Sequence, residues 1–240
     1  MTNSKQVQVA LILPTLNEKA NLEHLLPNIL EIQEISIVII VDDNSTDGSK
    51  EYFEDLRDGR VTVINRPSRL GIGSAHLDGL IKAKDMGADL IITMDADGTH
   101  RTEDLKKFLE MGGELDLVIG SRYEEGGEIL GWGVLRYVLT KVGHLATSVF
   151  FNSDLDMSSG MRAYKASAIP FDSLQKNCDS DYSFFFVSLL VYRNKKLQIT
   201  QVPIELNNRI SGKSKMIPVL MLRGVYTLFL YGVRIRKIKI

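Results

Sequence analysis

The residues from Ile35 to Val41 are mostly β-branched, and they run into the acidic and small polar segment Asp42–Gly48. A strand that is apolar on both faces must be covered on both, which is typical of a central strand in a parallel sheet. Similar apolar stretches recur along the chain, separated by segments with helical spacing. Strands are expected at Val7–Leu13, Ile35–Val41, Val61–Ile64, Leu90–Met94, Leu115–Gly120 and Ile199–Leu206. This alternation predicts right-handed βαβ units, and therefore an α/β fold with a doubly wound, mainly parallel sheet flanked by helices.

Three helices between and after these strands can be predicted from their apolar spacing. Leucine and isoleucine recur at helical spacing in Leu22–Leu30, but Pro27 inside this segment argues against an unbroken helix. The segments Gly73–Met86 and Val134–Phe151 carry apolar residues at the same spacing and are expected to be helical. The apolar run Phe184–Val187 is expected in the core or against lipid.

The composition fits one large α/β domain and excludes several other classes of protein. The chain has 240 residues and a formal net charge of −1, which argues against a nucleic-acid-binding protein with its usual basic stripe. Its single cysteine, Cys178, excludes a disulfide framework and a cysteine zinc site, and fits a reducing compartment. The polar N-terminus lacks the apolar stretch of a secretory signal.

Two carboxylates, Asp95 and Asp97, directly follow the strand expected at Leu90–Met94. Because the chain turns where a strand ends, both can reach one cation. Mg²⁺ and Mn²⁺ prefer oxygen ligands, commonly one or two carboxylates with substrate phosphates. Ligands of doubly wound sheets bind beyond the carboxyl ends of the strands, where Asp43 and Arg122 also fall. The pattern therefore predicts a site for a metal ion and a nucleotide at this edge.

Several of these residues also have a purely structural interpretation. Asp42 and Asp43 could serve only the turn after their strand. Single arginines are most often surface ion-pair partners, which is the alternative for Arg122, Arg136 and Arg209.

The last part of the chain, residues 213–240, differs in character from the rest. Met216–Val233 is mostly apolar but contains Arg223, and Arg234–Ile240 holds four basic residues and no acid. A charge in the middle of so short a segment disfavours a membrane span. An amphipathic interfacial helix with a basic membrane-proximal tail is therefore predicted, with a plain core helix as the alternative.

Short motifs occur along the chain in an order that resembles known enzymes. Three segments are similar to the nucleotide-sugar motifs of family 2 glycosyltransferases, namely Pro14–Glu18, Val41–Gly48 and Met94–Asp97. Others look like those of the narrower group of dolichol- or polyprenol-phosphate mannose synthases, namely Arg69–Ala75, Gly120–Tyr123, Asp156–Tyr164, Val202–Ile204, Arg209 and Gly212–Lys215. Each motif alone is weak, but their order over nearly the whole chain makes the resemblance specific.

The resemblance implies a GT-A fold that transfers a sugar, with inversion, from a nucleotide diphosphate to a polyprenyl phosphate, with GDP-mannose as the donor. It also implies roles for individual residues. Donor-binding residues would be Pro14, Leu16, Glu18, Val41, Asp43, Asp95, Arg209 and Lys215. A divalent metal, Mg²⁺ or Mn²⁺, would be held by Asp95, Asp97 and Thr99. The acceptor phosphate would be bound by Arg122, Arg136 and Thr140, and catalysis would rest on Asp97, Arg122 and Arg136.

The same resemblance implies an organisation and a location. A glycosyltransferase domain would span residues 1–212, with a nucleotide-sugar half at about 1–122 and an acceptor half at about 123–212. The helix and tail at 213–240 would place the enzyme peripherally on the cytoplasmic face of a membrane, with a membrane-protein partner as one option. A phosphate monoester has a second pKa of about 6 and is already nucleophilic at neutral pH, so no strong general base is required.

Two departures from the family pattern leave alternatives open. Leu16 stands where these synthases often have an aromatic residue that stacks on the base, and the segment from Asp181 lacks their usual Gln and Glu. Transfer of glucose or another hexose from a UDP-sugar to the same lipid is therefore the first alternative. A non-catalytic nucleotide-sugar-binding subunit of a membrane complex is the second, and a transferase with a soluble acceptor is the third.

Overall fold

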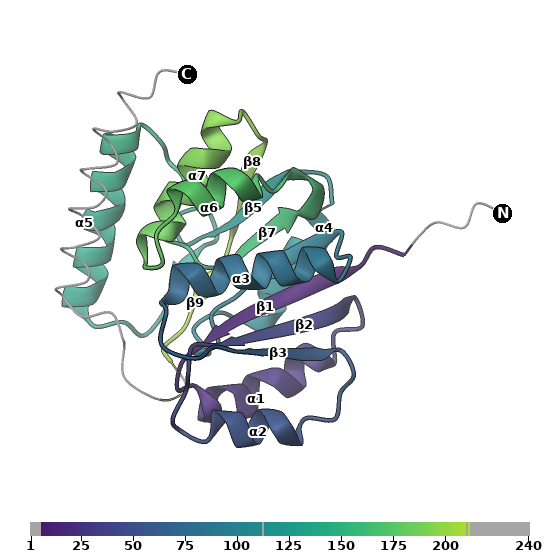
Figure 1. The fold of residues 1–240 in the computed structure, drawn as a ribbon. Helices are drawn as coiled ribbons and strands as arrows, with labels where there is room; N and C mark the ends of the chain where they lie inside the picture. Colours follow the sequence, from purple (N-terminus) through teal and green to yellow (C-terminus); the bar gives the residue numbers. More distant parts are fainter. Residues whose placement is uncertain (1–5, 112, 210, 212–240) are drawn as a thin grey trace.

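A mixed sheet of seven strands, in the order β3-β2-β1-β4-β7-β5-β8, forms the centre of the protein in a computed structural model that describes residues 6–111, 113–209 and 211 (Figure 1). The strands are β1 (Val9–Thr15), β2 (Ile35–Asp42), β3 (Val61–Asn65), β4 (Leu90–Thr93), β5 (Leu117–Ser121), β7 (Arg162–Lys165) and β8 (Ile199–Pro203). Only β7 runs antiparallel to its neighbours, β4 and β5. A second small parallel pair joins β6 (Glu128–Ile129) and β9 (Glu205–Leu206).

Helices cover both faces of the sheet because the central strands are apolar on both. Along β1, Leu11 and Leu13 belong to one buried cluster, whereas Ala10 and Ile12 belong to the other. The first cluster is completed by α1 (Lys19–Leu30), α2 (Ser49–Asp55) and α4 (Leu105–Met111), which follows the short helix η1 (Thr102–Asp104). The second is completed by α3 (Ile72–Asp85), α6 (Phe171–Asn177) and α7 (Ser183–Asn194), while the short helix η2 (Ala166–Ala168) follows β7.

The expected α/β fold with a mixed, mainly parallel sheet is confirmed, with differences in detail. The single strand expected at Ile199–Leu206 is divided into β8 and β9 around Ile204. Strand β7 was not predicted, because Arg162–Lys165 is short and carries a charged residue at each end. It is a strand only because β4 and β5 supply partners on both sides.

The doubt raised by Pro27 was wrong, because α1 continues through it to Leu30. Because Pro27 has no backbone N–H, the carbonyl of Glu23 lacks its helical hydrogen-bond donor. Both residues lie on the exposed side of the helix, so water can reach that carbonyl. One turn on, the Asn28 amide donates to the carbonyl of His24 at 3.3 Å.

Helix α5 (Val134–Phe151) has the bounds expected from its spacing, and it stands at one side of the molecule, apart from the layers around the sheet (Figure 1). Many of its apolar side chains face solvent; Val142, Leu145 and Val149 are 58%, 63% and 76% exposed. Within the described residues, no helix combines the length and apolarity needed to cross a membrane. The amphipathic helix predicted at Met216–Val233 lies outside the described residues, as does the basic tail after it.

Candidate active site

The carboxyl ends of the parallel strands β1, β2 and β4 meet at one edge of the sheet, as the fold predicts. Pro14 on β1 lies beside Val41 on β2, and Ile12 lies beside Thr93 on β4. The segments that follow these strands therefore start from a common edge. Six of the eight residues proposed to bind the donor lie at the ends of these strands or in the segments that follow them.

Asp97 lies at the centre of this edge, and both of its carboxylate oxygens are engaged. Its Oδ1 accepts hydrogen bonds from the backbone N–H of Thr99 at 2.9 Å and from the Thr99 hydroxyl at 2.6 Å. Its Oδ2 forms an ion pair with Nη2 of Arg209 at 2.8 Å. Gly98, with φ of +75°, makes the tight turn that brings Thr99 back onto Asp97. The Asp97 carboxylate is therefore held in a fixed orientation.

Arg209 bridges Asp97 and Glu18 at this edge. Besides Asp97, its guanidinium contacts Oε1 of Glu18 at 3.4 Å through Nη1. The segment that carries Arg209 is held in place because the N–H of Asn207 donates to the carbonyl of Thr99 at 2.9 Å. Residues separated by more than 100 positions in the sequence thus form one charged cluster.

Asp95 is more open than Asp97, with 34% of its side chain exposed. Burial and the negative charge of Asp97 raise its pKa, while His100 and Arg209 act in the opposite direction. Its backbone N–H donates to Nδ1 of His100 at 3.1 Å. A Cβ at position 160 would lie 2.8 Å from its Oδ1, so Gly160 leaves room for the Asp95 carboxylate.

The donor set fits a hard divalent cation that also uses ligands from the substrate. Within the part of the chain that the structure describes, no group of three or more His, Cys, Asp or Glu side chains could hold a metal by itself. Two nearby carboxylates with substrate phosphates are an ordinary arrangement for Mg²⁺ or Mn²⁺. Because the Thr99 hydroxyl donates to Asp97, it orients this carboxylate; its role as a third ligand stays a prediction.

Asp43 fixes the loop that precedes α3. Its carboxylate forms a buried ion pair with Arg66 at 2.9 Å and accepts hydrogen bonds from the backbone N–H groups of Leu70 and Gly71 at 2.8 and 2.9 Å. Its neighbour Asp42 accepts from the N–H and hydroxyl of Ser45. The turn interpretation therefore holds for Asp42, whereas Asp43 connects the ends of two different segments. Its role toward the donor stays a prediction.

Arg122, at the end of β5, is buried against Asp156 rather than exposed. Its Nε and Nη2 donate to the two oxygens of Asp156 at 2.7 and 2.6 Å, and Nη2 also donates to the Ser158 hydroxyl. Burial would lower the pKa of Arg122, but the charge and hydrogen bonds of Asp156 outweigh it and raise that pKa. The interpretation of Arg122 as a surface ion-pair partner was wrong, because this pair is buried. A bidentate pair of this kind also fixes the orientation of the guanidinium.

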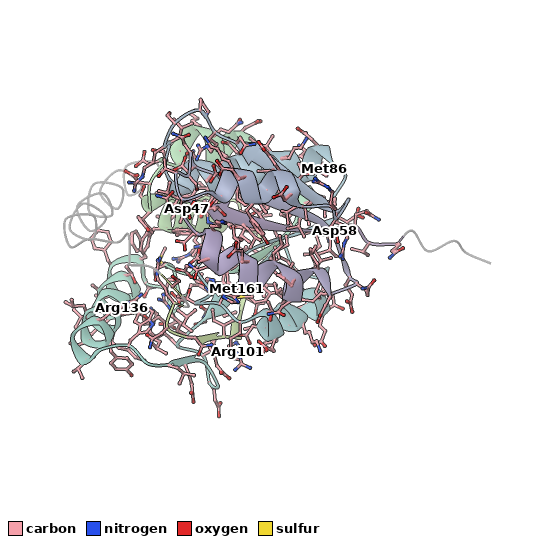
Figure 2. The ribbon with its side chains drawn as sticks, turned by 90° about the horizontal axis from the view of Figure 1, so that it is seen from below. Asp47, Asp58, Met86, Arg101, Arg136 and Met161 are labelled. Atoms are coloured by element: carbon pink, nitrogen blue, oxygen red, sulfur yellow. The ribbon has the colours of Figure 1, made fainter. Side chains whose placement is uncertain are left out.

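Arg136 lies in the first turn of α5, at the side of the molecule where this helix stands (Figure 2). Its guanidinium lies 3.5 Å from the centre of the Trp132 ring. Burial lowers its pKa, as do the charges of Arg209 and Arg122, while Asp97 raises it. The pKa of Arg136 therefore depends on burial together with charges at the acidic edge and on the segment after β5.

The remaining predicted residues have mixed positions. Thr140 accepts a hydrogen bond through its backbone carbonyl from the Tyr123 hydroxyl at 3.4 Å, which ties α5 to the segment after β5. Leu16 follows β1 and is partly buried. Lys215 lies outside the described residues.

Three residues of this region were missed by the sequence reasoning as site residues. Asp156 holds Arg122, and Arg66 holds Asp43. Neither pair could be predicted, because the two partners are far apart in the sequence. Tyr182, just before α7, is partly buried, and burial and the charge of Asp95 raise its pKa. Asp156 stands in the motif Asp156–Tyr164, which was the one available signal.

Residues 10–170 match the family model described as glycosyl transferase family 2. The chain belongs to glycosyl transferase family 2. An undecaprenyl-phosphate mannosyltransferase from Micrococcus luteus is 33% identical over 218 residues, which cover 88% of this chain and 88% of that protein. A polyprenol monophosphomannose synthase from Mycolicibacterium smegmatis is 29% identical over 230 residues, covering 93% of this chain and 86% of that protein. With this family and these relatives, the chain is a hexosyltransferase.

The structure of glucosyl-3-phosphoglycerate synthase from Mycobacterium tuberculosis, in complex with Mn²⁺, uridine diphosphate and phosphoglyceric acid, has the same fold as this glycosyltransferase. The TM-score is 0.69 at 19% identity, covering 94% of this chain and 78% of that chain. The likeness confirms the expected GT-A fold.

Proposed function

We propose that this glycosyltransferase transfers mannose, with inversion, from GDP-mannose to a polyprenyl phosphate. The relatives named for this type of reaction support the proposal, and one structural observation carries it. Strand β4, which leads to Asp97 and its ion pair with Arg209, is separated in the sheet from β5, which ends beside Arg122, by β7 alone. A single site thus combines acidic groups suited to a metal–diphosphate with cations suited to a second phosphate.

At the donor end, Asp95 and Asp97 would hold a divalent cation, which neutralises the charge that builds on the departing diphosphate. The ion pair between Asp97 and Arg209 keeps a guanidinium at the same place, where it can bind a diphosphate oxygen. Pro14, Leu16, Glu18, Val41 and Asp43 would line the pocket for the base and ribose, and Lys215 would add a further donor contact.

At the acceptor end, Arg122 and Arg136 would hold the phosphate monoester near the anomeric carbon, with the Thr140 hydroxyl as a neutral donor. The monoester is largely dianionic at neutral pH and attacks without a general base. Attack from the face opposite the diphosphate forms the new C–O bond as the old one breaks, and this produces inversion. The task of the protein is then mainly to position two anions against each other.

The acceptor lipid implies a membrane surface as a partner. The exposed apolar side chains of α5 lie on the helix that also carries Arg136, so lipid contact there would bring the acceptor phosphate to the site. The basic tail at Arg234–Ile240 would add attraction of about 1 kcal/mol per basic residue near an anionic leaflet. We propose a peripheral position on the cytoplasmic face, with a membrane-protein partner as an option.

The proposal is tested by incubating the purified chain with a short polyprenyl phosphate, labelled GDP-mannose and Mg²⁺ or Mn²⁺, then measuring label in the organic phase. Label that depends on the metal and disappears with EDTA is the expected result. Absence of lipid label with GDP-mannose, despite binding of the nucleotide, would contradict the proposal. An unchanged rate without detergent, with label only in a water-soluble product, would indicate a soluble acceptor.

Transfer from UDP-glucose to the same lipid is the second candidate, and the presence of Leu16 in place of a base-stacking aromatic residue favours it. A parallel reaction with labelled UDP-glucose, and competition by GDP or UDP, separates the two donors. Competition by GDP alone supports mannose. Competition by UDP alone would keep the acceptor and replace the donor.

A further inference from the structure

We propose that Lys141 on α5 is a further binding residue for the phosphate of the acceptor, in a cavity that it shares with Arg122. This inference rests on the proposed function and extends its acceptor end. The cavity has a volume of about 210 Å³. It is lined by Arg122, Gly127, Glu128, Ile129, Tyr137 and Lys141.

Two tyrosine rings hold the Lys141 ammonium in this position. Its Nζ lies 4.8 Å from the centre of the Tyr123 ring and 5.6 Å from that of Tyr137, both within the range of a cation–π interaction. The Tyr123 ring is fixed in turn, because it stacks on His144 at 3.7 Å. The side chain is therefore directed by aromatic contacts, unlike a lysine that extends freely into solvent.

The Lys141 charge is also left available for an anion. No carboxylate of the described residues lies within 4.0 Å of its Nζ, so aromatic faces are its neighbours instead of a counter-ion. Glu128 lines the same cavity, but it occupies an exposed position on β6. An ammonium on aromatic rings keeps its full charge and its three N–H donors for a ligand.

The charges around the acceptor phosphate explain why another cation is needed. Asp156 balances the charge of Arg122 through a bidentate pair, so that pair contributes little net charge. The acceptor monoester carries close to two negative charges at neutral pH. Among the described residues, no carboxylate pairs with Arg136, so Arg136 supplies one unbalanced positive charge and Lys141 supplies the second.

The test uses the single tryptophan of the chain, Trp132, which lies under the Arg136 guanidinium and reports on the acceptor end. Farnesyl phosphate is titrated against the full chain and its variants while Trp132 fluorescence is followed. Lys141→Met should weaken binding about tenfold, as expected for the loss of one charge-assisted contact, and Lys141→Arg should restore most of it. The KM for GDP-mannose should not change in either variant.

Lys84→Met is the matched control. Lys84 also lies over an aromatic ring, 4.6 Å from the centre of Phe171, and lines another cavity. It stands near the far end of α3, about 20 Å along the helix axis from the end that borders the site. This variant should bind farnesyl phosphate like the wild type. Equal weakening in Lys84→Met and Lys141→Met would overturn the proposal.

Two further ligands identify what Lys141 recognises. Farnesol lacks the phosphate and should bind equally to the wild type and Lys141→Met, while inorganic phosphate should compete less well against farnesyl phosphate in the variant. Unchanged farnesyl phosphate affinity in Lys141→Met refutes the role of Lys141 and leaves the proposed reaction intact. Weakened affinity in a chain that transfers no mannose would keep Lys141 and refute the proposed donor. No binding of farnesyl phosphate to the wild type would overturn both.

Discussion

The carboxylate of Asp156 holds Arg122 through hydrogen bonds of 2.7 and 2.6 Å in the interior of the protein. Burial would raise the pKa of Asp156, but the charge and hydrogen bonds of Arg122 outweigh burial and lower it. Removing one partner of a buried pair leaves an uncompensated charge, which typically costs about 3–5 kcal/mol. Asp156→Asn should lower the free energy of unfolding by about this amount in denaturant titrations at pH 7, and it should also raise the KM for the acceptor.

The same pair predicts a pH dependence with a definite sign. Because the folded-state pKa of Asp156 is below its ordinary value of 3.8, the pair stabilises the protein above that value and loses its effect as the pH falls below it. The difference in unfolding free energy between wild type and Asp156→Asn should therefore shrink between pH 5 and pH 2. A difference that stays constant over this range would contradict the assigned ionisation.

His76 is a second buried titratable group, and it lies in the core rather than in the site. Its ring stacks on Phe184 at 5.6 Å and meets Phe185 edge-on at 5.0 Å, and neither nitrogen has a hydrogen-bond partner among the described residues. Burial lowers its pKa from 6.5 to about 3, helped by the charge of Arg162 and by His100. The unfolded chain thus binds a proton below pH 6.5 that the folded protein does not.

His76→Phe should remove this dependence while keeping an aromatic ring in place. Relative to the variant, the wild type should lose about 1.4 kcal/mol of unfolding free energy per pH unit below 6.5, and the two should differ little in slope above pH 7. Denaturant titrations between pH 8 and pH 5 measure the effect. Parallel curves over the whole range would contradict this, because they would mean that the folded protein binds the His76 proton as readily as the unfolded chain does.

At the residue scale, the predictable part of the site is the part that the motifs carry directly. Asp95 and Asp97 could be located because an apolar strand leads straight into them. The residues that hold the site in place could not be located in this way. Asp156 lies 34 positions from its partner Arg122, and Arg66 lies 23 positions from its partner Asp43. Such pairs depend on which strands become neighbours, and a single sequence does not contain that information.

At the scale of elements, the helices and strands that could be predicted were those with a regular spacing of apolar residues. Strands such as β2 and helices such as α5 were predictable because burial imposes a period on their residues. Strand β7 was not, because it is defined by its two neighbours rather than by its own residues. Pro27 misled because a proline usually breaks a helix, whereas this one falls on the exposed side of α1, where the loss of one hydrogen bond is tolerated.

Helix α5 leads to a prediction about membrane association. Replacing Val142, Leu145 and Val149 together by Gln should weaken sedimentation with anionic lipid vesicles, because these exposed apolar side chains on one helix supply part of the interfacial contact. Thermal stability should change little, since these side chains are already exposed. Val7 and Leu70 are also exposed, at 56% and 46%, and their replacement by Gln is the control that should leave sedimentation unchanged. Equal sedimentation of the triple variant and wild type would contradict the role of α5.

At the scale of the whole molecule, the sheet joins the parts that we propose to serve the two substrates. Strand β7, which follows α5, lies between β4, which leads to Asp95 and Asp97, and β5, which ends beside Arg122. The division at about residue 122 therefore stays a prediction about function; structurally, one sheet contains strands from both sides of it. The sequence predicted the fold class, whereas the strand order that brings these residues together required the structure.

The most direct test compares mannose transfer to a short polyprenyl phosphate by the purified wild type and by Asp97→Asn, with Mn²⁺ present. Asp58→Asn is the control, since Asp58 lies at the edge of the molecule (Figure 2) and forms a local ion pair with Arg60 at 2.8 Å. Asp97→Asn should lose at least about 100-fold in turnover, because it removes the charge that orients Arg209 and that we propose to hold the cation. Asp58→Asn should keep full activity. Full turnover by Asp97→Asn would contradict the proposal and make this chain an accessory subunit rather than the catalyst.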